Sequence, residues 1–348
     1  MNWIGNRARG AVSATLLAAA IAGPAMADPI TDFYRGKTLR VIVGYDAGGG
    51  YDLYGRIFAN NFGRFMPGNP TVIVQNMPGA GSLVAARYLN NIAPKDGTSF
   101  GSLAQTLALD TAMAGANADF NAGNMPYIGR FTGSVDLGLG LPGAWFKTFQ
   151  DARTKEIVVG ASGVASTAYL LPAALNQHGG AKFKIIAGFK GSNDIFVAAE
   201  RKEVEFVGSI NLSVIMLKNP EWVTEGKAPI LYQGGLKRHA LLPNVPALPE
   251  LGISADDKSV LTAISAATEV GRAINTTPGV PPERLAALRK AFNAMMKDKE
   301  FLAEMDKRKT LIDHMDGEEI DKITKQILAF PKSIIDQTSA LMKPPAKK

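Results

Sequence analysis

The sequence predicts an α/β protein with two lobes, each a mixed, mostly parallel β-sheet flanked by helices. First, short runs of β-branched residues end in glycine-rich turns, after which an amphipathic helical pattern begins at once. Second, the same order of strand, small-residue turn and helix starts again in the second half of the chain. Alternating strands and helices favour parallel sheets with helices on their faces. Two such units with matching turns predict a cleft between two lobes.

The first glycine turn is the most informative segment of the chain. A strand at residues 39–43 runs into Ala47-Gly48-Gly49-Gly50, and a helix over about 51–65 follows directly. The start of a helix leaves backbone N–H groups unpaired, and the helix dipole adds partial positive charge there. Glycines let the backbone bend and place no side chain in the path of a ligand. The turn therefore predicts an anion-binding site, for a phosphate or a carboxylate.

The rest of the first half places a second glycine turn on the same edge of the sheet. A strand at 71–75 ends in the turn 77–82, and a helix at 83–90 follows. Another turn at 93–97 leads to a strand around 99–103. Ligands of parallel sheets bind beyond the carboxyl ends of the strands, where both glycine turns are expected.

The second half repeats this pattern, and charged amphipathic helices at the end of the chain are expected to pack on the outside. The predicted elements are a strand at 157–160, the turn 161–167 with a helix to about 177, a strand at 184–188, the turn 189–194 with a helix to about 202, a strand at 204–207, and helical segments at 281–305 and 317–336.

The N-terminus has the features of a secretory signal peptide. Arg7 and Arg9 precede an apolar run at 11–22, which closes on Ala25-Met26-Ala27, a small-x-small cleavage site. The apolar run is too short to span a bilayer. We therefore expect residues 1–27 to be removed, with cleavage after Ala27, and the mature chain to be exported to the periplasm. The sequence contains no cysteine, which excludes disulfides, thiolate metal sites and a cysteine nucleophile.

Composition and motifs argue against several functional classes. The net charge of +7 is modest for 348 residues and forms no basic stripe, so nucleic acid is not expected as a partner. Neither glycine turn continues as a Walker A motif, and Leu53 and Val84 stand where the dinucleotide fingerprint needs a small residue. Asp46 and Asp52 flank the first turn, but the regularly spaced Asp and Asn residues of a calcium-binding loop are not present around them. We predict no cofactor and no metal.

A serine hydrolase is an alternative from another class. Ser162 lies between a strand and a helix, as a hydrolase nucleophile does, but Val164 replaces the last glycine of G-x-S-x-G. A hydrolase would use Ser162 or Ser166 together with a histidine base. None of the three histidines has a sequence context that indicates activation: His178, His239 and His314. We therefore expect the protein not to be an enzyme.

Six segments, taken in chain order, form a pattern that spans essentially the whole mature sequence. They are LRVIVGY with AGGG and Asp52 (39–52), VIVQNMPGAGS (72–82), APKDG (93–97), YIGR (127–130), FKGS with EVE (189–205) and LPNVPAL (242–248). In this order they resemble the signatures of the substrate-binding proteins of tripartite tricarboxylate transporters, the Bug or TctC-like family.

The resemblance implies a two-lobed, type II-like periplasmic binding protein that closes on its ligand like a Venus flytrap. The implied division is a signal peptide at 1–27, a first lobe at 28–130 and 229–348 that includes the C-terminal helices, and a second lobe at 131–228. Family members hold a carboxylate through backbone amides at the first turn and at a facing turn of the other lobe. By position, the expected ligand-binding residues are Tyr45, Ala47, Gly48, Gly49, Tyr51, Asp52, Ser162, Ser166, Thr167, Lys190 and Gly191.

Two residues depart from the family pattern. Asp46 stands where the family often has proline, and Tyr51 where it often has threonine or serine. Because Asp46 adds negative charge beside an anion site, we expect its side chain to point away from that site. Tyr51 changes the volume of the pocket and offers an aromatic wall.

The function implied by the resemblance is capture of an organic carboxylate in the periplasm. The ligand would be a dicarboxylate, a tricarboxylate or an aromatic acid, and a monomeric protein would deliver it to the permease subunits of a tripartite tricarboxylate transporter. A sensory co-receptor that signals to a membrane kinase remains an alternative, because it would use the same closure of the two lobes.

Overall fold

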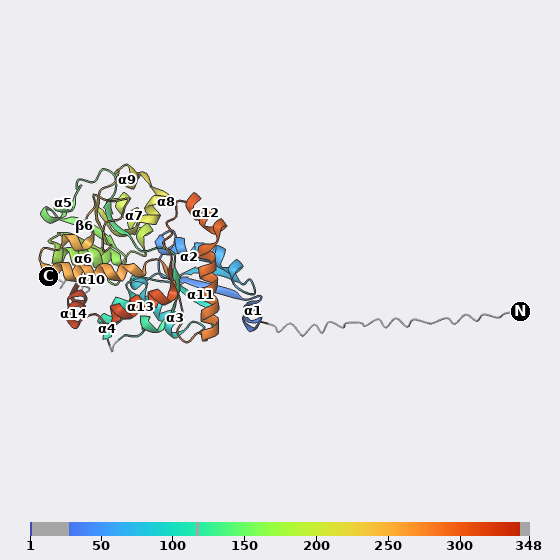
Figure 1. Cartoon of the computed structure of the whole chain (residues 1–348). Helices are drawn as coiled ribbons and strands as arrows, with labels where there is room; N and C mark the ends of the chain where they lie inside the picture. Colours follow the sequence, from blue (N-terminus) through green and yellow to red (C-terminus); the bar gives the residue numbers. More distant parts are fainter. Residues whose placement is uncertain (2–27, 116–117, 342–348) are drawn as a thin grey trace.

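The computed structural model describes Met1 and residues 28–115 and 118–341, and Figure 1 shows how their elements are arranged. The predicted signal peptide, apart from Met1, lies outside the described residues. The described chain forms two sheets, one in each lobe. None of its helices combines the length and the apolar character that crossing a membrane would require.

The first lobe contains a six-stranded sheet with the order β11-β4-β10-β3-β1-β2. Strands β2 and β3 both run parallel to β1, whereas β10 is antiparallel to β3 and to β4. The last three residues of β1 are fully buried, as expected for a strand covered by helices on both faces. The strands are β1 (Thr38–Val43), β2 (Thr71–Asn76), β3 (Ser99–Ser102), β4 (Tyr127–Arg130), β10 (Ala273–Thr276) and β11 (Met315–Asp316).

Helices cover this sheet, and the C-terminal ones pack on its outside as predicted (Figure 1). Helices α11 and α13 both contact β4. The helices of this lobe are α1 (Pro29–Tyr34), α2 (Gly50–Asn61), α3 (Leu83–Asn91), α4 (Leu107–Ala114), α11 (Pro282–Lys297), α12 (Lys299–Lys307), α13 (Gly317–Leu328) and α14 (Lys332–Leu341).

Two predicted helices are interrupted in the structure. The helix expected at 51–65 ends as an α-helix at Asn61 and tightens into a 3-10 turn, Phe62–Phe65, where Gly63 lies so close to Pro70 that a Cβ would be 2.3 Å from its carbonyl oxygen. The helix expected at 281–305 breaks at Asp298. The carboxylate of Asp298 accepts a hydrogen bond from the N–H of Phe301 (2.9 Å) and so starts a new helix.

The second lobe contains a five-stranded sheet with the order β7-β6-β8-β5-β9. Strands β7, β6 and β8 are parallel, and β5 is antiparallel to β8 and β9. The strands are β5 (Asp136–Gly140), β6 (Ile157–Ala161), β7 (Phe183–Ala187), β8 (Phe206–Asn211) and β9 (Ile230–Gln233). The helices are α5 (Phe149–Thr154), α6 (Thr167–Gly179), α7 (Ser192–Glu200), α8 (Leu212–Lys218) and α9 (Glu221–Thr224).

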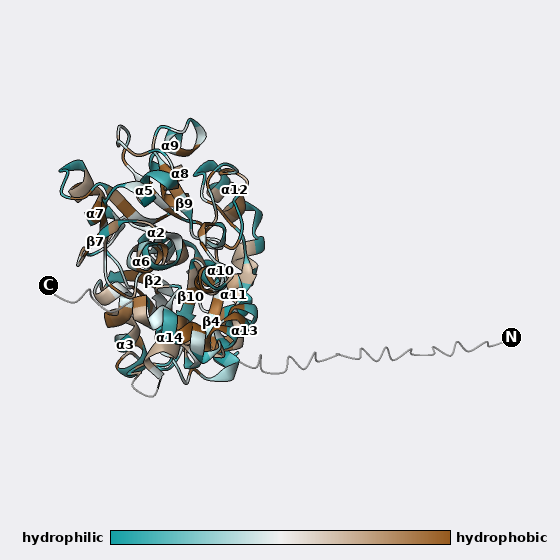
Figure 2. Ribbon diagram, turned by 90° about the vertical axis from the view of Figure 1, so that its left-hand side faces the viewer, coloured by the Kyte–Doolittle hydropathy of each residue, from teal (hydrophilic) through white to brown (hydrophobic). Residues whose placement is uncertain are grey.

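Each lobe has an aromatic core of its own. In the first lobe the rings of Phe58 and Phe62 stack with their centroids 4.3 Å apart, and in the second lobe those of Phe183 and Phe206 stack at 5.4 Å. All four side chains are buried. Figure 2 shows hydrophobic residues on strands inside the molecule and hydrophilic residues on outer helices such as α12. These two aromatic clusters belong to one continuous set of buried hydrophobic side chains, which also joins the two lobes across the hinge between them.

The described part of the chain crosses between the lobes twice. The first crossing, 131–135, joins β4 to β5, and the second joins β9 to β10 through α10 (Ala255–Ala267). The sequence-based boundary at 228 is too early by sheet membership, because β9 pairs with β5 in the second sheet. Strands β4, β5, β9 and β10, each four or five residues long, were not predicted from the sequence.

Candidate ligand-binding site

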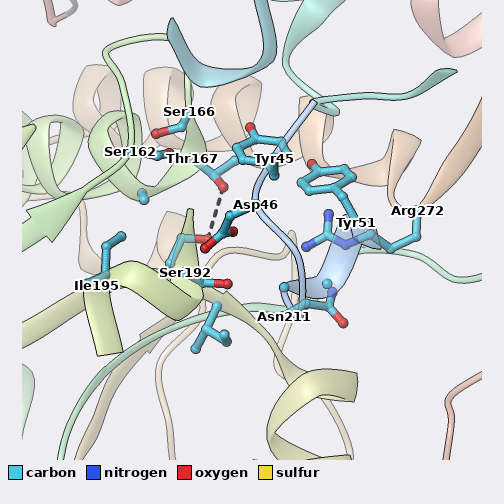
Figure 3. Close-up of a pocket in the computed structure, with 15 residues that line it drawn as sticks. Tyr45, Asp46, Tyr51, Ser162, Ser166, Thr167, Ser192, Ile195, Asn211 and Arg272 are labelled. Atoms are coloured by element: carbon cyan, nitrogen blue, oxygen red, sulfur yellow. Dashed lines mark hydrogen bonds between the residues drawn. The ribbon is translucent and has the colours of Figure 1, made fainter. Parts of the chain in front are cut away.

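A small cavity of about 40 Å³ lies between the two lobes, where the first glycine turn faces the second-lobe turns that precede α6 and α7 (Figure 3). Most of its wall is formed by small, hydroxyl-bearing or amide-bearing residues, with two tyrosines and one residue of each charge. The lining residues are Tyr45, Asp46, Gly49, Gly50, Tyr51, Ser162, Ser166, Thr167, Ala168, Ser192, Ile195, Ser209, Ile210, Asn211 and Arg272.

Three helix N-termini meet at this cavity. Helix α2 comes from the first lobe, and α6 and α7 come from the second. Their N-cap residues are Gly49, Ser166 and Gly191, and none of the three caps its helix with a side-chain hydrogen bond. The first N–H groups of a helix have no partner within the helix, and the dipole makes this end partially positive. The arrangement is suited to an anion held from both lobes.

Asp52 maintains the shape of the first glycine turn. Its Oδ2 accepts hydrogen bonds from the backbone N–H of Gly48 (2.9 Å) and from Arg56 (2.8 Å), and its Oδ1 accepts one from Asn76 (2.9 Å). Gly48 has a φ of +85°, which glycine adopts without strain. Burial, the largest single influence, raises the pKa of Asp52, but the hydrogen bonds from Arg56, Gly48 and Asn76 together lower it below its usual value. Asp52 is therefore ionised and holds the turn from behind the cavity.

Replacing Asp52 with alanine is expected to lower the free energy of unfolding by about 1–3 kcal/mol, because three part-buried hydrogen bonds lose their acceptor. Since the pKa of Asp52 is lowered in the folded state, its contribution is present above the unfolded-state pKa and is lost as the pH falls through the folded-state pKa. Urea unfolding at pH 7 and at pH 3 measures both effects. A difference between wild type and Asp52→Ala that is as large at pH 3 as at pH 7 would contradict this role.

The two tyrosines form part of a three-layer stack. The rings of Tyr45 and Tyr51 lie 4.6 Å apart and nearly parallel, and the guanidinium of Arg272 lies 4.1 Å from the centroid of Tyr51. The Tyr45 hydroxyl donates to the carbonyl of Gly81 (3.3 Å), and the Tyr51 hydroxyl accepts from the N–H of Gln105 (3.1 Å). Burial raises the pKa of both phenols, which stay neutral. Tyr51 is thus an aromatic wall of the cavity.

Arg272 links the cavity to the hinge. It lies just before β10 of the first lobe and donates to Asp136 at the start of β5 in the second lobe (2.8 Å) and to Gln105 (3.0 Å). Asp136 also accepts hydrogen bonds from Gln105 (2.8 Å) and Ser134 (2.7 Å). The side chains of Arg272 and Asp136 are 4% and 0% exposed. A buried ion pair therefore spans the two lobes beside the cavity.

The expectation that Asp46 points away from the cavity is wrong. Its side chain lies on the cavity wall between Thr167 and Ser192 (Figure 3). Its Oδ2 accepts a hydrogen bond from the backbone N–H of Asp194 (3.3 Å), in the first turn of α7. The partial positive charge at the N-terminus of α7 attracts this carboxylate from the opposite lobe. Burial, as the main cause, raises the pKa of Asp46.

The structure brings together six of the eleven residues expected from the sequence. Tyr45, Gly49, Tyr51, Ser162, Ser166 and Thr167 line the cavity. Gly191 lies directly behind Asp46, since a Cβ on Gly191 would be within 1.8 Å of Asp46 Oδ1. Asp52 supports the turn from behind, while Ala47, Gly48 and Lys190 are exposed outside the cavity wall.

Several cavity residues were not predicted, and the main ones are Asp46, Ser192, Ser209, Asn211 and Arg272. Ser192 had a detectable signal, because it lies within the predicted turn 189–194 at the start of α7. Ser209 and Asn211 lie on β8, whose predicted end at residue 207 was too early. Arg272 lies far along the chain from every glycine turn, and nothing in its sequence context indicates a role.

The geometry does not support a serine hydrolase in the described part of the chain. Ser166 Oγ donates to the carbonyl of Gly163 (2.6 Å) rather than to a base. The histidines interact elsewhere: His178 with Asp257, His239 with the N–H of Leu241, and His314 with Asn293. The described residues also contain no cluster of three His, Asp or Glu side chains arranged to hold a metal ion.

Comparison with known proteins identifies the family. The model of the TctC family, described as the tripartite tricarboxylate transporter family receptor, matches residues 56–339. The chain belongs to the TctC family. This confirms the resemblance found in the sequence. A relative, the "UPF0065 protein in gbd 5'region" of Cupriavidus necator, is 31% identical over 257 residues, which cover 71% of this chain and 73% of that protein.

Solved structures confirm the two-lobed periplasmic binding protein fold of this TctC-family chain. The periplasmic binding protein BugD has a TM-score of 0.69 at 18% identity and matches 88% of this chain and 98% of its own. Rpa4515 of Rhodopseudomonas palustris with adipate has a TM-score of 0.67 at 16% identity, over 87% of this chain and 97% of its own. MatC from Rhodopseudomonas palustris with bound malate has a TM-score of 0.66 at 16% identity, over 88% of this chain and 99% of its own.

Proposed function

We propose that this TctC-family receptor is a periplasmic solute-binding protein that captures a small organic carboxylate by closing its two lobes. The observation that carries the proposal is the meeting of three helix N-termini, from both lobes, at one cavity, with no cap from the side chain of their own N-cap residue. Donors on both sides of a cleft stabilise a closed form only when an anion lies between them, so ligand binding shifts the population toward closure. Binding proteins of the same fold with adipate and malate support this assignment.

The second part of the proposal concerns delivery. The protein, acting as a monomer in the periplasm after cleavage behind Ala27, hands the carboxylate to the permease subunits of a tripartite tricarboxylate transporter. Membership of the receptor family supports this step. No covalent chemistry is required. Deletion of the gene is expected to abolish uptake of the ligand, and uptake unchanged by the deletion would contradict the transport role.

The binding step is tested by a thermal-shift screen of protein freed of ligand by unfolding and refolding. The panel contains linear dicarboxylates, tricarboxylates, aromatic acids and amino acids, each at pH 7. A ligand that binds only the folded state stabilises it by about 2.7 kcal/mol at a hundredfold excess over Kd, so at least one carboxylate is expected to raise Tm by several degrees. Uncharged amides of the same acids serve as controls. The proposal fails if no carboxylate raises Tm more than its amide does.

A further inference from the structure

Two buried polar atoms on the cavity wall have no hydrogen-bond partner among the described residues. They are Oδ1 of Asp46 and Nε of Arg272. Leaving a buried polar atom unpaired costs free energy, and charged groups cost the most. An unpaired acceptor and an unpaired donor on the wall of one cavity indicate that its occupant offers hydrogen bonds of both kinds.

The two charges on the wall are not equivalent. The charge of Arg272 is balanced by Asp136, which accepts one of its N–H groups at 2.8 Å. Asp46 receives only the backbone N–H of Asp194, and Asp194 and Asp52 add further negative potential at its carboxylate. The cavity therefore keeps one negative charge that has no cationic side chain as a partner among the described residues, and that charge is the carboxylate of Asp46.

Asp46 also occupies the N-terminus of α7, so this helix end is not available to the ligand. Its Oδ1 lies against Gly191, the N-cap of α7, where a Cβ would approach it to 1.8 Å. It also lies beside Gly49, the N-cap of α2, where a Cβ would be 3.5 Å from it. The N-termini of α2 and α6 remain for a carboxylate of the ligand. A second carboxylate of the ligand, placed toward α7, would face Asp46 across the cavity.

We propose that Asp46 is the specificity-determining residue of this site and selects a ligand with one carboxylate and one protonated amine. This inference rests on the proposed function as a carboxylate-binding protein. The ligand's carboxylate lies at the N-termini of α2 and α6, and its ammonium group donates to Asp46 Oδ1. Ile195 covers the carbon chain between them. A dicarboxylate of the same length is rejected, because juxtaposed like charges without a cation between them are strongly unfavourable.

The test uses pairs of probes that differ only at one end: β-alanine against succinate, and 4-aminobutyrate against glutarate. Affinities are measured by calorimetry on ligand-stripped wild-type protein and on Asp46→Asn, which keeps the shape of the side chain and removes its charge. Wild type is expected to bind at least one amino acid about tenfold or more tighter than its dicarboxylate partner. In Asp46→Asn the preference is expected to disappear or reverse.

Asp256→Asn is the matched control, because it makes the same change at an exposed carboxylate outside the cavity wall. It is expected to keep the preference of the wild type. Two outcomes overturn the inference but leave the proposed function standing. One is that wild type binds the dicarboxylates as tightly as the amino acids or more tightly. The other is that Asp46→Asn keeps the preference of the wild type. Absence of binding by both classes, together with a negative carboxylate screen, overturns the proposed function as well.

Discussion

The variant Asp136→Ala is expected to lose about 3–5 kcal/mol of unfolding free energy, because it leaves the guanidinium of Arg272 buried without its counter-charge. Both side chains are almost completely removed from water, and Asp136 also accepts from Gln105 and Ser134. Arg272 cannot become neutral by losing its proton, since guanidinium groups stay charged in proteins. Chemical denaturation followed by circular dichroism measures the loss. A decrease below about 1 kcal/mol would contradict the role of this pair.

A double variant separates the net contribution of the ion pair to the unfolding free energy from the cost of leaving one of its charges unpaired. Replacing both residues, as Asp136→Leu with Arg272→Met, removes the two charges together and is expected to restore much of the stability, because apolar residues of similar size often replace buried ion pairs without loss. Asp336→Ala is the surface control. It breaks the exposed ion pair of Asp336 with Lys332 and is expected to leave stability unchanged, as exposed pairs contribute little.

Enlarging Gly163 is expected to weaken ligand binding at least about tenfold, a change of about 1.4 kcal/mol, by preventing full closure of the lobes. Gly163 in the second lobe packs backbone to backbone on the second glycine turn of the first lobe. A Cβ there would lie 2.6 Å from the amide nitrogen of Gly81 and 2.9 Å from the carbonyl carbon of Ala80. These are backbone atoms of a tight turn and cannot rotate away, so the lobes must separate.

A graded series tests the steric origin of this effect. Gly163→Ala is expected to weaken binding of the best carboxylate from the screen, and Gly163→Val to weaken it more. The unfolding free energy is expected to change little, because opening of the cleft relieves the clash without disturbing either core. Small-angle scattering is expected to show a larger radius of gyration for the valine variant. Wild-type affinity in Gly163→Val would show that this contact does not limit closure.

The local parts of the fold were predictable because each depends on neighbours in sequence. The strand that ends at Val43, the glycine turn and the helix that begins at Gly50 occur nearly where hydrophobic pattern and glycine spacing place them. The same holds for the turns before α6 and α7. The family resemblance is confirmed over residues 56–339, a range that begins after the first glycine turn. Strands such as β9 and β10 were missed; they join the sheets by antiparallel pairing with strands far away in the sequence, outside the repeated order of strand, turn and helix.

The side-chain arrangement of the cavity was not predictable in the same way. Asp46 was expected to avoid an anion site, and that reasoning considered only the first lobe. The N-terminus of α7, almost 150 positions further along the chain, supplies the partial positive charge that draws its carboxylate inward. Arg272 reaches the cavity because β10 inserts between β3 and β4, which no local pattern near residue 272 indicates.

The first glycine turn shows which features the sequence determines by itself and which depend on the tertiary structure. Its sequence alone was enough to predict unpaired helix N–H groups at the end of a strand, because strand, turn and helix are set by residues close in the chain. Which side chains share the space in front of those N–H groups depended on the packing of two sheets and on two crossings between the lobes. That packing placed Asp46, Arg272 and the hydroxyls of the second lobe around one cavity, since contacts between distant segments form only when the whole chain folds.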